Sequence, residues 1–428
     1  MIESKQRHVV VLGAGFGGLT FCQTFRHPAA RITVVDRTNH HLFQPLLYQV
    51  AACGLSAPEI AQPIRGILSH RTDITVLFNR VVSFDLVKQQ VQLEKGKLDY
   101  DYLVLAMGGQ TGYFGHPEWE RFAPGLKTLD DALRIRSKIL LAFEQAENEN
   151  NPAERDRLLT TVVVGGGPTG VELAGAFAEL ARTVLNRDFR RIDPTKARIL
   201  LIEGSPLVLS HLPPDLSASA QRQLEGLGVQ IRNNIHVKDI RAGEVELANG
   251  EIICAGNIIW AAGVSATPLT RKLGVKLDKA GRVKANPDLS LPGHPEVFAI
   301  GDMALVLQES GQPVPGVSPA AMQMGRHVAK IIEREINSHD QPLSRAAFKY
   351  RDKGTMATIG RSAAVAWLGR FKCSGFPAWL AWLFIHLIFL IGFRNRLAVL
   401  FQWTWSYFSF NRSARIITYA PPDSSETK

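Results

Sequence analysis

Cysteine is scarce in this chain of 428 residues, and its four positions form no recognisable pattern. Cys22, Cys53, Cys254 and Cys373 include no CxxC pair and no spacing typical of a metal site. This excludes a disulfide framework, favours a reducing compartment and predicts no bound metal. We expect Cys22 and Cys254 to be buried thiols, because one falls in a predicted helix and the other in a strand-like run.

Acidic residues are nearly missing from the last fifth of the chain. Residues 345–428 hold twelve Lys or Arg against three Asp or Glu, which accounts for most of the net charge of +10. A nucleic-acid-binding protein would be basic throughout, so we exclude nucleic acid and predict that 345–415 meets an anionic membrane surface. The N-terminus also lacks the apolar stretch of a signal peptide, so we expect the protein in the cytoplasm or on the cytoplasmic face of the cell membrane.

A glycine-rich loop comes within the first twenty residues. Val9–Leu12 is a continuous apolar run, as expected of a strand buried in a parallel sheet. Three glycines follow in GxGxxG spacing and open a predicted helix: Gly13, Gly15 and Gly18. Such a loop lets a backbone approach a pyrophosphate at a helix N-terminus. Asp36 ends the next predicted strand, Arg31–Val35, where a carboxylate can accept from a ribose hydroxyl.

The same pattern recurs in the middle of the chain. After the predicted strand Thr161–Val164 come three more glycines in the same register: Gly165, Gly167 and Gly170. Glu203 ends the following strand. In the first copy 95 residues separate Gly13 from Gly108, at an Ala-x-Gly strand end, and in the second 98 separate Gly165 from Gly263. We infer an internal duplication and therefore two dinucleotide-binding domains.

Other segments complete the predicted organisation. Ile60–Leu68 is predicted to be a helix, Leu129–Glu147 a long amphipathic helix, and Val297–Ile300 a buried strand ending in Gly301-Asp302. That ending would put the Asp302 carboxylate at the carboxyl edge of a parallel sheet, where ligands bind.

A long apolar segment lies near the C-terminus. Residues 376–393 carry no formal charge, residues 397–410 are also apolar, and five of the seven tryptophans fall between 367 and 405. Tryptophan favours the bilayer interface, so this segment predicts membrane association. Its length leaves a spanning helix and an interfacial helix equally open.

These motifs together resemble the flavoprotein reductases with two dinucleotide-binding domains, and more closely the type II NADH:quinone oxidoreductases. The resemblance covers nearly the whole chain and rests on VLGAGFGGL, NHHLFQPLLYQVA (39–51), YDYLVLAMGG (100–109), VVVGGGPTGVELAG (162–175), WAAGV (260–264), FAIGDMA (298–304), SPAAMQMGRHVA (318–329) and KGTMATIGR (353–361). It implies an α/β fold with two Rossmann-like domains, the second inserted in the first, and a C-terminal membrane-anchoring helical segment. The expected boundaries are 1–115 with 270–340 for FAD, 116–269 for NADH, and 341–428 for the anchor. It also implies a monotopic homodimer.

The resemblance assigns cofactor contacts to the motif residues. It places FAD at Gly13, Gly15, Gly18, Asp36, Gln44, Gly108 and Asp302. It places NADH at Gly165, Gly167, Gly170, Glu203 and Gly263. The residues independently favour NADH over NADPH, because Glu203 would repel a 2′-phosphate and Gly-Ser-Pro after it offers no arginine.

The implied reaction is hydride transfer from NADH to FAD, followed by two-electron reduction of a quinone without proton pumping. Glu172, Gln323 and Lys353 are the candidate catalytic residues. Two positions depart from the usual motifs: Met107 stands where a threonine is common, and Pro319 replaces one of two glutamines in the quinone motif.

Two alternatives remain at this stage. A soluble reductase of a ferredoxin or rubredoxin would not need the 376–410 segment. A flavin-bearing redox sensor would not need the flavin, NADH and quinone motifs together. Disulfide reductases and sulfide:quinone oxidoreductases require paired cysteines beside the flavin, and residues 39–55 contain only Cys53.

Overall fold

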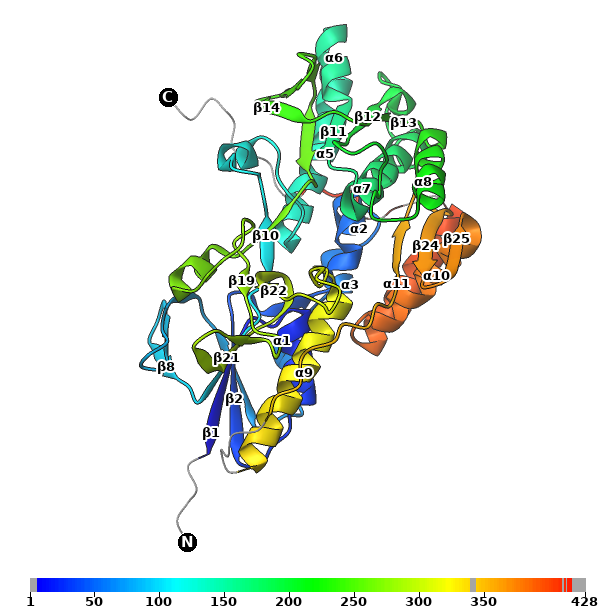
Figure 1. Ribbon diagram of the computed structural model, residues 1–428. Helices are drawn as coiled ribbons and strands as arrows, with labels where there is room; N and C mark the ends of the chain where they lie inside the picture. The colour runs from blue at the N-terminus through cyan, green and yellow to red at the C-terminus, as the bar shows by residue number, and fades with distance from the viewer. Residues whose placement is uncertain (1–5, 339–343, 410–411, 413, 418–428) are drawn as a thin grey trace. The chain divides into compact units, whose positions relative to one another are not determined.

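The computed structural model describes residues 6–338, 344–409, 412 and 414–417 (Figure 1). The chain divides into two compact units, each assembled from three stretches. The first contains Met1–Leu42, Ala61–Gln110 and Val264–Lys353, and the second contains Phe43–Ile60, Thr111–Gly263 and Gly354–Lys428. The chain leaves the first unit along β10 (Gly109–Thr111) and re-enters it at β18 (Val264–Ala266).

A six-stranded sheet forms the centre of the first unit, in the order β20-β21-β9-β1-β2-β5. Its strands are β1 (Arg7–Leu12), β2 (Ala30–Asp36), β5 (Ile74–Phe78), β9 (Tyr102–Leu105), β20 (Ser290–Leu291) and β21 (His294–Ala299). All pairs are parallel except β20 with β21. The apolar runs of β1 and β9 are almost fully buried, which confirms these predicted strands.

Two helices of the first unit pack together closely. They are α1 (Phe16–Thr24) and α9 (Ser318–Asn337). A Cβ at Gly325 would lie 2.4 Å from the carbonyl oxygen of Gly17, so this contact requires glycine. The smaller elements are β3 (His40–Leu42), β4 (Ala61–Pro63), α4 (Ile64–Ile67), β6 (Val81–Asp85), β7 (Gln90–Leu93), β8 (Lys97–Asp99), η5 (Pro268–Leu273), β19 (Val283–Lys284), η6 (Gly301–Met303) and β22 (Ala304–Leu305).

The second unit repeats this plan. Its parallel sheet runs β13-β12-β11-β17, the counterpart of β5-β2-β1-β9. The strands are β11 (Thr160–Val164), β12 (Arg198–Ile202), β13 (Val229–Arg232) and β17 (Asn257–Trp260). A three-stranded antiparallel sheet, β14 (Val237–Arg241), β15 (Glu244–Leu247) and β16 (Ile252–Cys254), corresponds to β6-β7-β8. The matching strand orders support the inferred duplication.

The second unit also contains helices from Phe43–Ile60 and Thr111–Gly263. They are η1 (Gln44–Leu46), α2 (Leu47–Ala51), α3 (Ala57–Ile60), η2 (Pro117–Arg121), α5 (Leu129–Asn148), α6 (Pro152–Leu158), α7 (Pro168–Glu179), η3 (Leu180–Val184), η4 (Pro194–Lys196) and α8 (Pro214–Gly226). The predicted helix α5 begins with a capping box between Thr128 and Asp131. After residue 353 the chain adds β23 (Thr355–Thr358), β24 (Ala364–Leu368), β25 (Phe371–Ser374), α10 (Phe376–Phe389) and α11 (Phe393–Ser409).

Two expectations need correction. The helix predicted over Ile60–Leu68 is wrong: β4 interrupts it, because Pro63 disfavours helix for the residue before it. Cys254 is exposed at the end of β16, whereas Cys22 is buried as expected. In the C-terminal apolar segment, α10 ends at Phe389 and α11 starts at Phe393. Residue 410 of the second apolar run lies outside the described residues.

Candidate functional site

The first glycine loop has the geometry of a dinucleotide cradle. Gly13 has φ +99°, and a Cβ there would lie 2.4 Å from the carbonyl oxygen of Ala106. A Cβ at Gly18 would lie 1.9 Å from the carbonyl oxygen of Gly13. Gly15, in contrast, has an ordinary extended backbone, and a Cβ there would meet no atom within 4 Å. Two glycines therefore shape the loop, and the third leaves open space before the N-terminus of α1, as a pyrophosphate requires.

Asp36 is tied to this loop by its carboxylate. One oxygen accepts from the backbone N–H of Ala14 at 2.7 Å, and the other accepts from the N–H and hydroxyl of Thr38. The oxygen that accepts only from Ala14 has a second lone pair, so the side chain can still accept from a ribose hydroxyl. The buried His41 also contacts the loop, because its Nδ1 lies 2.9 Å from the Ala14 carbonyl oxygen.

The second loop reproduces the first residue by residue. Gly165 has φ +109°, a Cβ at Gly170 would lie 1.8 Å from the carbonyl oxygen of Gly165, and a Cβ at Gly167 would meet nothing. Glu203 accepts from the N–H groups of Gly166 and Ser205, as Asp36 does from Ala14 and Thr38. The residues of both loops therefore fit a dinucleotide.

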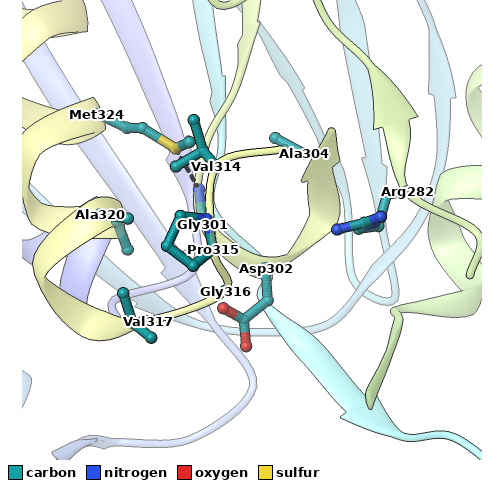
Figure 2. Close-up of a pocket in the computed structure, with 11 residues that line it drawn as sticks. Arg282, Gly301, Asp302, Ala304, Val314, Pro315, Gly316, Val317, Ala320 and Met324 are labelled. Atoms are coloured by element: carbon teal, nitrogen blue, oxygen red, sulfur yellow. Dashed lines mark hydrogen bonds between the residues drawn. The ribbon is translucent and has the colours of Figure 1, made fainter. Parts of the chain in front are cut away.

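Asp302 lines a pocket in the first unit, at the end of β21. Figure 2 shows its carboxylate beside Gly316 and Pro315, with Arg282 across the pocket. The neighbouring Gly301 has φ +74°, and its N–H donates to the sulfur of Met324 at 3.2 Å. The predicted strand therefore delivers Asp302 to the carboxyl edge of the sheet.

The remaining predicted cofactor contacts have simpler surroundings. Gly108 has φ +67°, and a Cβ there would meet no atom within 4 Å. Gln44 is exposed and donates from its side-chain amide to the carbonyl of Lys127 at 3.2 Å. A Cβ at Gly263 would lie 2.8 Å from the carbonyl oxygen of Gly112, so this position needs glycine for packing.

Glu172 lies in the first turns of α7, directly after the second loop. Burial raises the pKa of its carboxyl group to about 8, and a backbone hydrogen bond from Thr358 opposes the shift only in part. The side chain is therefore mostly a neutral acid at pH 7, able to donate a proton.

Gln323 and Lys353 both belong to the first unit. The Gln323 amide pairs with the backbone of Arg351: its nitrogen donates to the carbonyl and its oxygen accepts from the N–H, both at 2.9 Å. This reciprocal pair holds the segment before Lys353 against α9. Lys353 itself is exposed.

Sequence reasoning missed a charged cluster in the second unit. The buried Glu179, at the end of α7, accepts from Arg412 at 2.8 Å and from the backbone N–H of Arg361. Arg412 also donates to the carbonyl of Ala52. More than two hundred residues separate Glu179 from Arg412, so no local pattern could have paired them. The cluster attaches the C-terminal segment to α7 and to residues 43–60.

No group of His, Cys, Asp and Glu within the described ranges could hold a metal ion. The four cysteines are unpaired, and burial raises the pKa of Cys53 to about 11. Cys53 is therefore a protonated thiol at neutral pH, without the low pKa of a reactive cysteine.

Comparisons with known proteins agree with this geometry. A model of the pyridine nucleotide-disulphide oxidoreductase family matches residues 7–325. Two type II NADH:quinone oxidoreductases of Mycobacterium tuberculosis, NdhA and Ndh, are each 43% identical to the chain, covering 96% and 97% of it and 90% and 91% of their own lengths. The structure of NDH2 from Plasmodium falciparum in complex with NADH shares the fold, with a TM-score of 0.88 at 20% identity, over 97% of this chain and 100% of that one.

A more distant structure has the same fold. The sulfide:quinone oxidoreductase of Aquifex aeolicus aligns with a TM-score of 0.70 at 20% identity, over 91% of this chain and 92% of that one. From the family match and the identity over nearly full length, the chain belongs to the pyridine nucleotide-disulphide oxidoreductase family and, within it, to the type II NADH:quinone oxidoreductases.

Proposed function

We propose that the chain oxidises NADH with the help of bound FAD and reduces a membrane quinone by two electrons, without proton pumping. One observation carries the proposal: a chain of this family has two glycine loops, and each loop donates a backbone N–H to the carboxylate at the end of the next strand, Asp36 or Glu203. FAD would accept a hydride from NADH and pass two electrons to the quinone. The chain's own residues bind the two dinucleotides and supply a proton.

We assign FAD to the first unit and NADH to the loop of the second. Gly15 and Gly167 leave room for the two pyrophosphates, and Asp36 and Glu203 face the adenosine riboses. We also retain Asp302 as an FAD contact and Gln323 and Lys353 as quinone-side residues. Gln323 can contact the quinone while it stays paired with Arg351, because one N–H of its amide remains available.

The experiment that tests this function follows the flavin by stopped-flow absorbance. NADH is expected to bleach it, and a ubiquinone or menaquinone analogue to restore it. If NADH leaves the flavin oxidised, the proposal is wrong. If quinones fail to reoxidise the flavin while a ferredoxin succeeds, a soluble carrier-protein reductase replaces the proposal.

Exposed apolar side chains support membrane binding by the C-terminal segment. Among the helices in the described part of the chain, none is long and apolar enough to cross a membrane. Helix α10 has 14 residues, about 21 Å at 1.5 Å per residue, against a hydrocarbon core of about 30 Å. We propose that α10 and α11 lie in the interface, with the basic residues of 345–415 against anionic head groups. We further propose the cytoplasmic face and a homodimer.

Glu203 is expected to set the preference for NADH. Replacing it by alanine removes a charged acceptor and the repulsion of a 2′-phosphate. We expect the KM for NADH to rise about 10- to 100-fold, since a hydrogen bond to a charged group contributes about 1.5–3 kcal/mol. The ratio of NADPH to NADH oxidation should rise as well, measured by initial rates with both. Glu225→Ala, exposed on α8 of the same unit, is the control. An unchanged NADPH-to-NADH ratio would remove Glu203 from the adenosine site.

Glu172 is expected to control the pH dependence of quinone reduction. Its raised pKa of about 8 keeps the proton available at pH 7, so the reoxidation rate should fall as pH rises through 8. In Glu172→Gln the rate should be about 10- to 100-fold lower and flat across this range. The exposed Glu120→Gln should keep the wild-type profile. A mutant with the wild-type profile would assign the titration to another group.

The raised pKa of Glu172 also makes the free energy of unfolding depend on pH. Glu172 binds its proton more tightly in the folded chain than in the unfolded one, so its contribution to the free energy of unfolding is largest below about pH 4.5. That contribution is lost as pH rises to 8. The melting temperature of Glu172→Gln should therefore depend less on pH between these limits than that of the wild type.

A further inference from the structure

A hydrogen-bonded chain of three side chains connects α11 to α2 within the second unit. The indole Nε1–H of Trp403 donates to Oε1 of Gln49 at 2.8 Å, and Nε2 of Gln49 donates to the hydroxyl of Tyr48 at 2.9 Å. We call Trp403, Gln49 and Tyr48 the relay chain. Trp403 and Gln49 are more than 350 residues apart in sequence. The relay chain therefore joins a helix with exposed apolar residues to the motif LLYQVA.

The chemistry of tryptophan fixes the direction of every bond in the relay chain. An indole N–H can only donate, so the Gln49 oxygen must face Trp403 and the Gln49 nitrogen must face Tyr48. The Tyr48 oxygen is then an acceptor towards Gln49, and its own proton has to go to a different acceptor. Within the described residues the hydroxyl makes no other hydrogen bond.

Tyr48 is buried and feels the charges of several ionisable side chains. Its side chain is 6% exposed, and burial raises the pKa of the phenol well above its usual value. The charged groups that act on it are Glu172 and Glu179, which raise the pKa further, and Arg412, which lowers it. Tyr48 therefore keeps its proton at every physiological pH.

The aromatic residues next to Tyr48 include a second donor without a partner. The Trp382 ring lies 6.4 Å from that of Tyr48, is 1% exposed, and within the described residues its Nε1–H makes no hydrogen bond. His386 stacks on Trp382 at 4.1 Å, and burial lowers its pKa to about 4, so it stays neutral. Two neutral, buried donors suit a neutral molecule with two carbonyl oxygens better than an anion.

We propose that Tyr48 is the residue that hands a proton to the quinone oxygen, held in position by Gln49 and Trp403 and resupplied by Glu172. This inference rests on the proposed function. The quinone gains two electrons and one proton as the hydride equivalent from NADH, and it needs one more proton. The Tyr48 O–H bond breaks as the quinone O–H bond forms, the Glu172 proton moves to the Tyr48 oxygen, and Glu172 recovers a proton from water. The sum is NADH, H⁺ and quinone giving NAD⁺ and quinol.

The test compares acceptors that need protons with one that does not. Tyr48→Phe should slow reoxidation of the flavin by a ubiquinone analogue about 10- to 100-fold. It should leave flavin reduction by NADH and reoxidation by ferricyanide, which takes electrons alone, within about twofold of wild type. The solvent deuterium isotope effect on the quinone step, expected in the wild type, should change in Tyr48→Phe. Trp403→Phe should slow the quinone step less, because it frees Gln49 without removing the hydroxyl.

Matched controls separate the relay from simple packing. Tyr113→Phe removes an equally buried hydroxyl of the second unit, which donates to the carbonyl of Ala123, and Trp405→Phe changes an exposed indole on α11. Both should keep wild-type quinone rates.

Two outcomes would overturn the proposal: wild-type quinone rates in Tyr48→Phe, or an equal loss with quinone and ferricyanide. Failure of the proposed function is a different result, since the unmutated protein would then fail to reduce any quinone.

Discussion

Replacing Gly18 by alanine is expected to give a protein that retains little or no flavin. The new Cβ would lie 1.9 Å from the carbonyl oxygen of Gly13, so the loop has to move away from the cofactor. Such overpacking costs about 1–3 kcal/mol or more, a 10- to 100-fold loss of FAD affinity or greater. The measurement is bound flavin per chain by absorbance, together with the melting temperature, which should also fall.

Gly15→Val distinguishes the binding of FAD from the folding of the loop. Its backbone conformation suits any residue, and its Cβ would meet no protein atom within 4 Å. The valine would fill only the space assigned to the pyrophosphate, so flavin should be lost while the apoprotein keeps its stability.

The second loop provides the matched control. Gly167→Val should retain FAD and lose NADH-driven bleaching, because Gly167 has the same open surroundings in the other unit. A normal flavin content in Gly15→Val would remove the pyrophosphate from this loop, and loss of FAD in Gly167→Val would reverse the two assignments.

Two charges on the C-terminal helices are expected to release the protein from membranes. Phe384 on α10 and Phe401 on α11 are 66% and 69% exposed. Burying one phenylalanine in an apolar phase stabilises by about 1.5–3 kcal/mol, so Phe384→Glu with Phe401→Glu should lower partitioning at least about 100-fold. Co-sedimentation with vesicles of anionic and neutral phospholipids measures this. NADH-driven flavin bleaching should be unchanged.

An exposed phenylalanine elsewhere controls for a general loss of apolar surface. Phe78, at the end of β5 in the first unit, is 70% exposed, and Phe78→Glu should leave vesicle binding intact. Continued binding of the doubly charged protein would mean that α10 and α11 are not the anchor. Binding that is equally strong with neutral lipids would remove the role proposed for the basic residues.

The nucleotide loops could be predicted from the sequence because their constraints are local. Gly13 and Gly18 are required by contacts within a few residues or across one strand pair, and the period of the glycine motif preserves that geometry. Asp36 and Glu203 follow at a fixed point, the end of the next strand. The family resemblance then distinguished FAD from NADH, which spacing alone left open.

Other features depend on contacts between distant segments. Nothing near Tyr48 in the sequence indicates that Trp403 lies two hydrogen bonds away, and nothing near Glu179 indicates Arg412. The interruption of the predicted helix, in contrast, has a local signal in the sequence, which is Pro63. Burial of Cys254 was inferred from its apolar neighbours, whereas the end of an outer strand leaves it exposed.

The order of strands in the first unit has a consequence for how the chain folds during synthesis. β9 pairs with β21, which lies nearly two hundred residues further on, and α1 packs on α9 later still. The uninterrupted stretch Thr111–Gly263 of the second unit emerges from the ribosome before either partner exists. We therefore expect this stretch to become compact first, while β9 waits with an unpaired edge. Cells that make this protein rapidly need chaperones most during that interval.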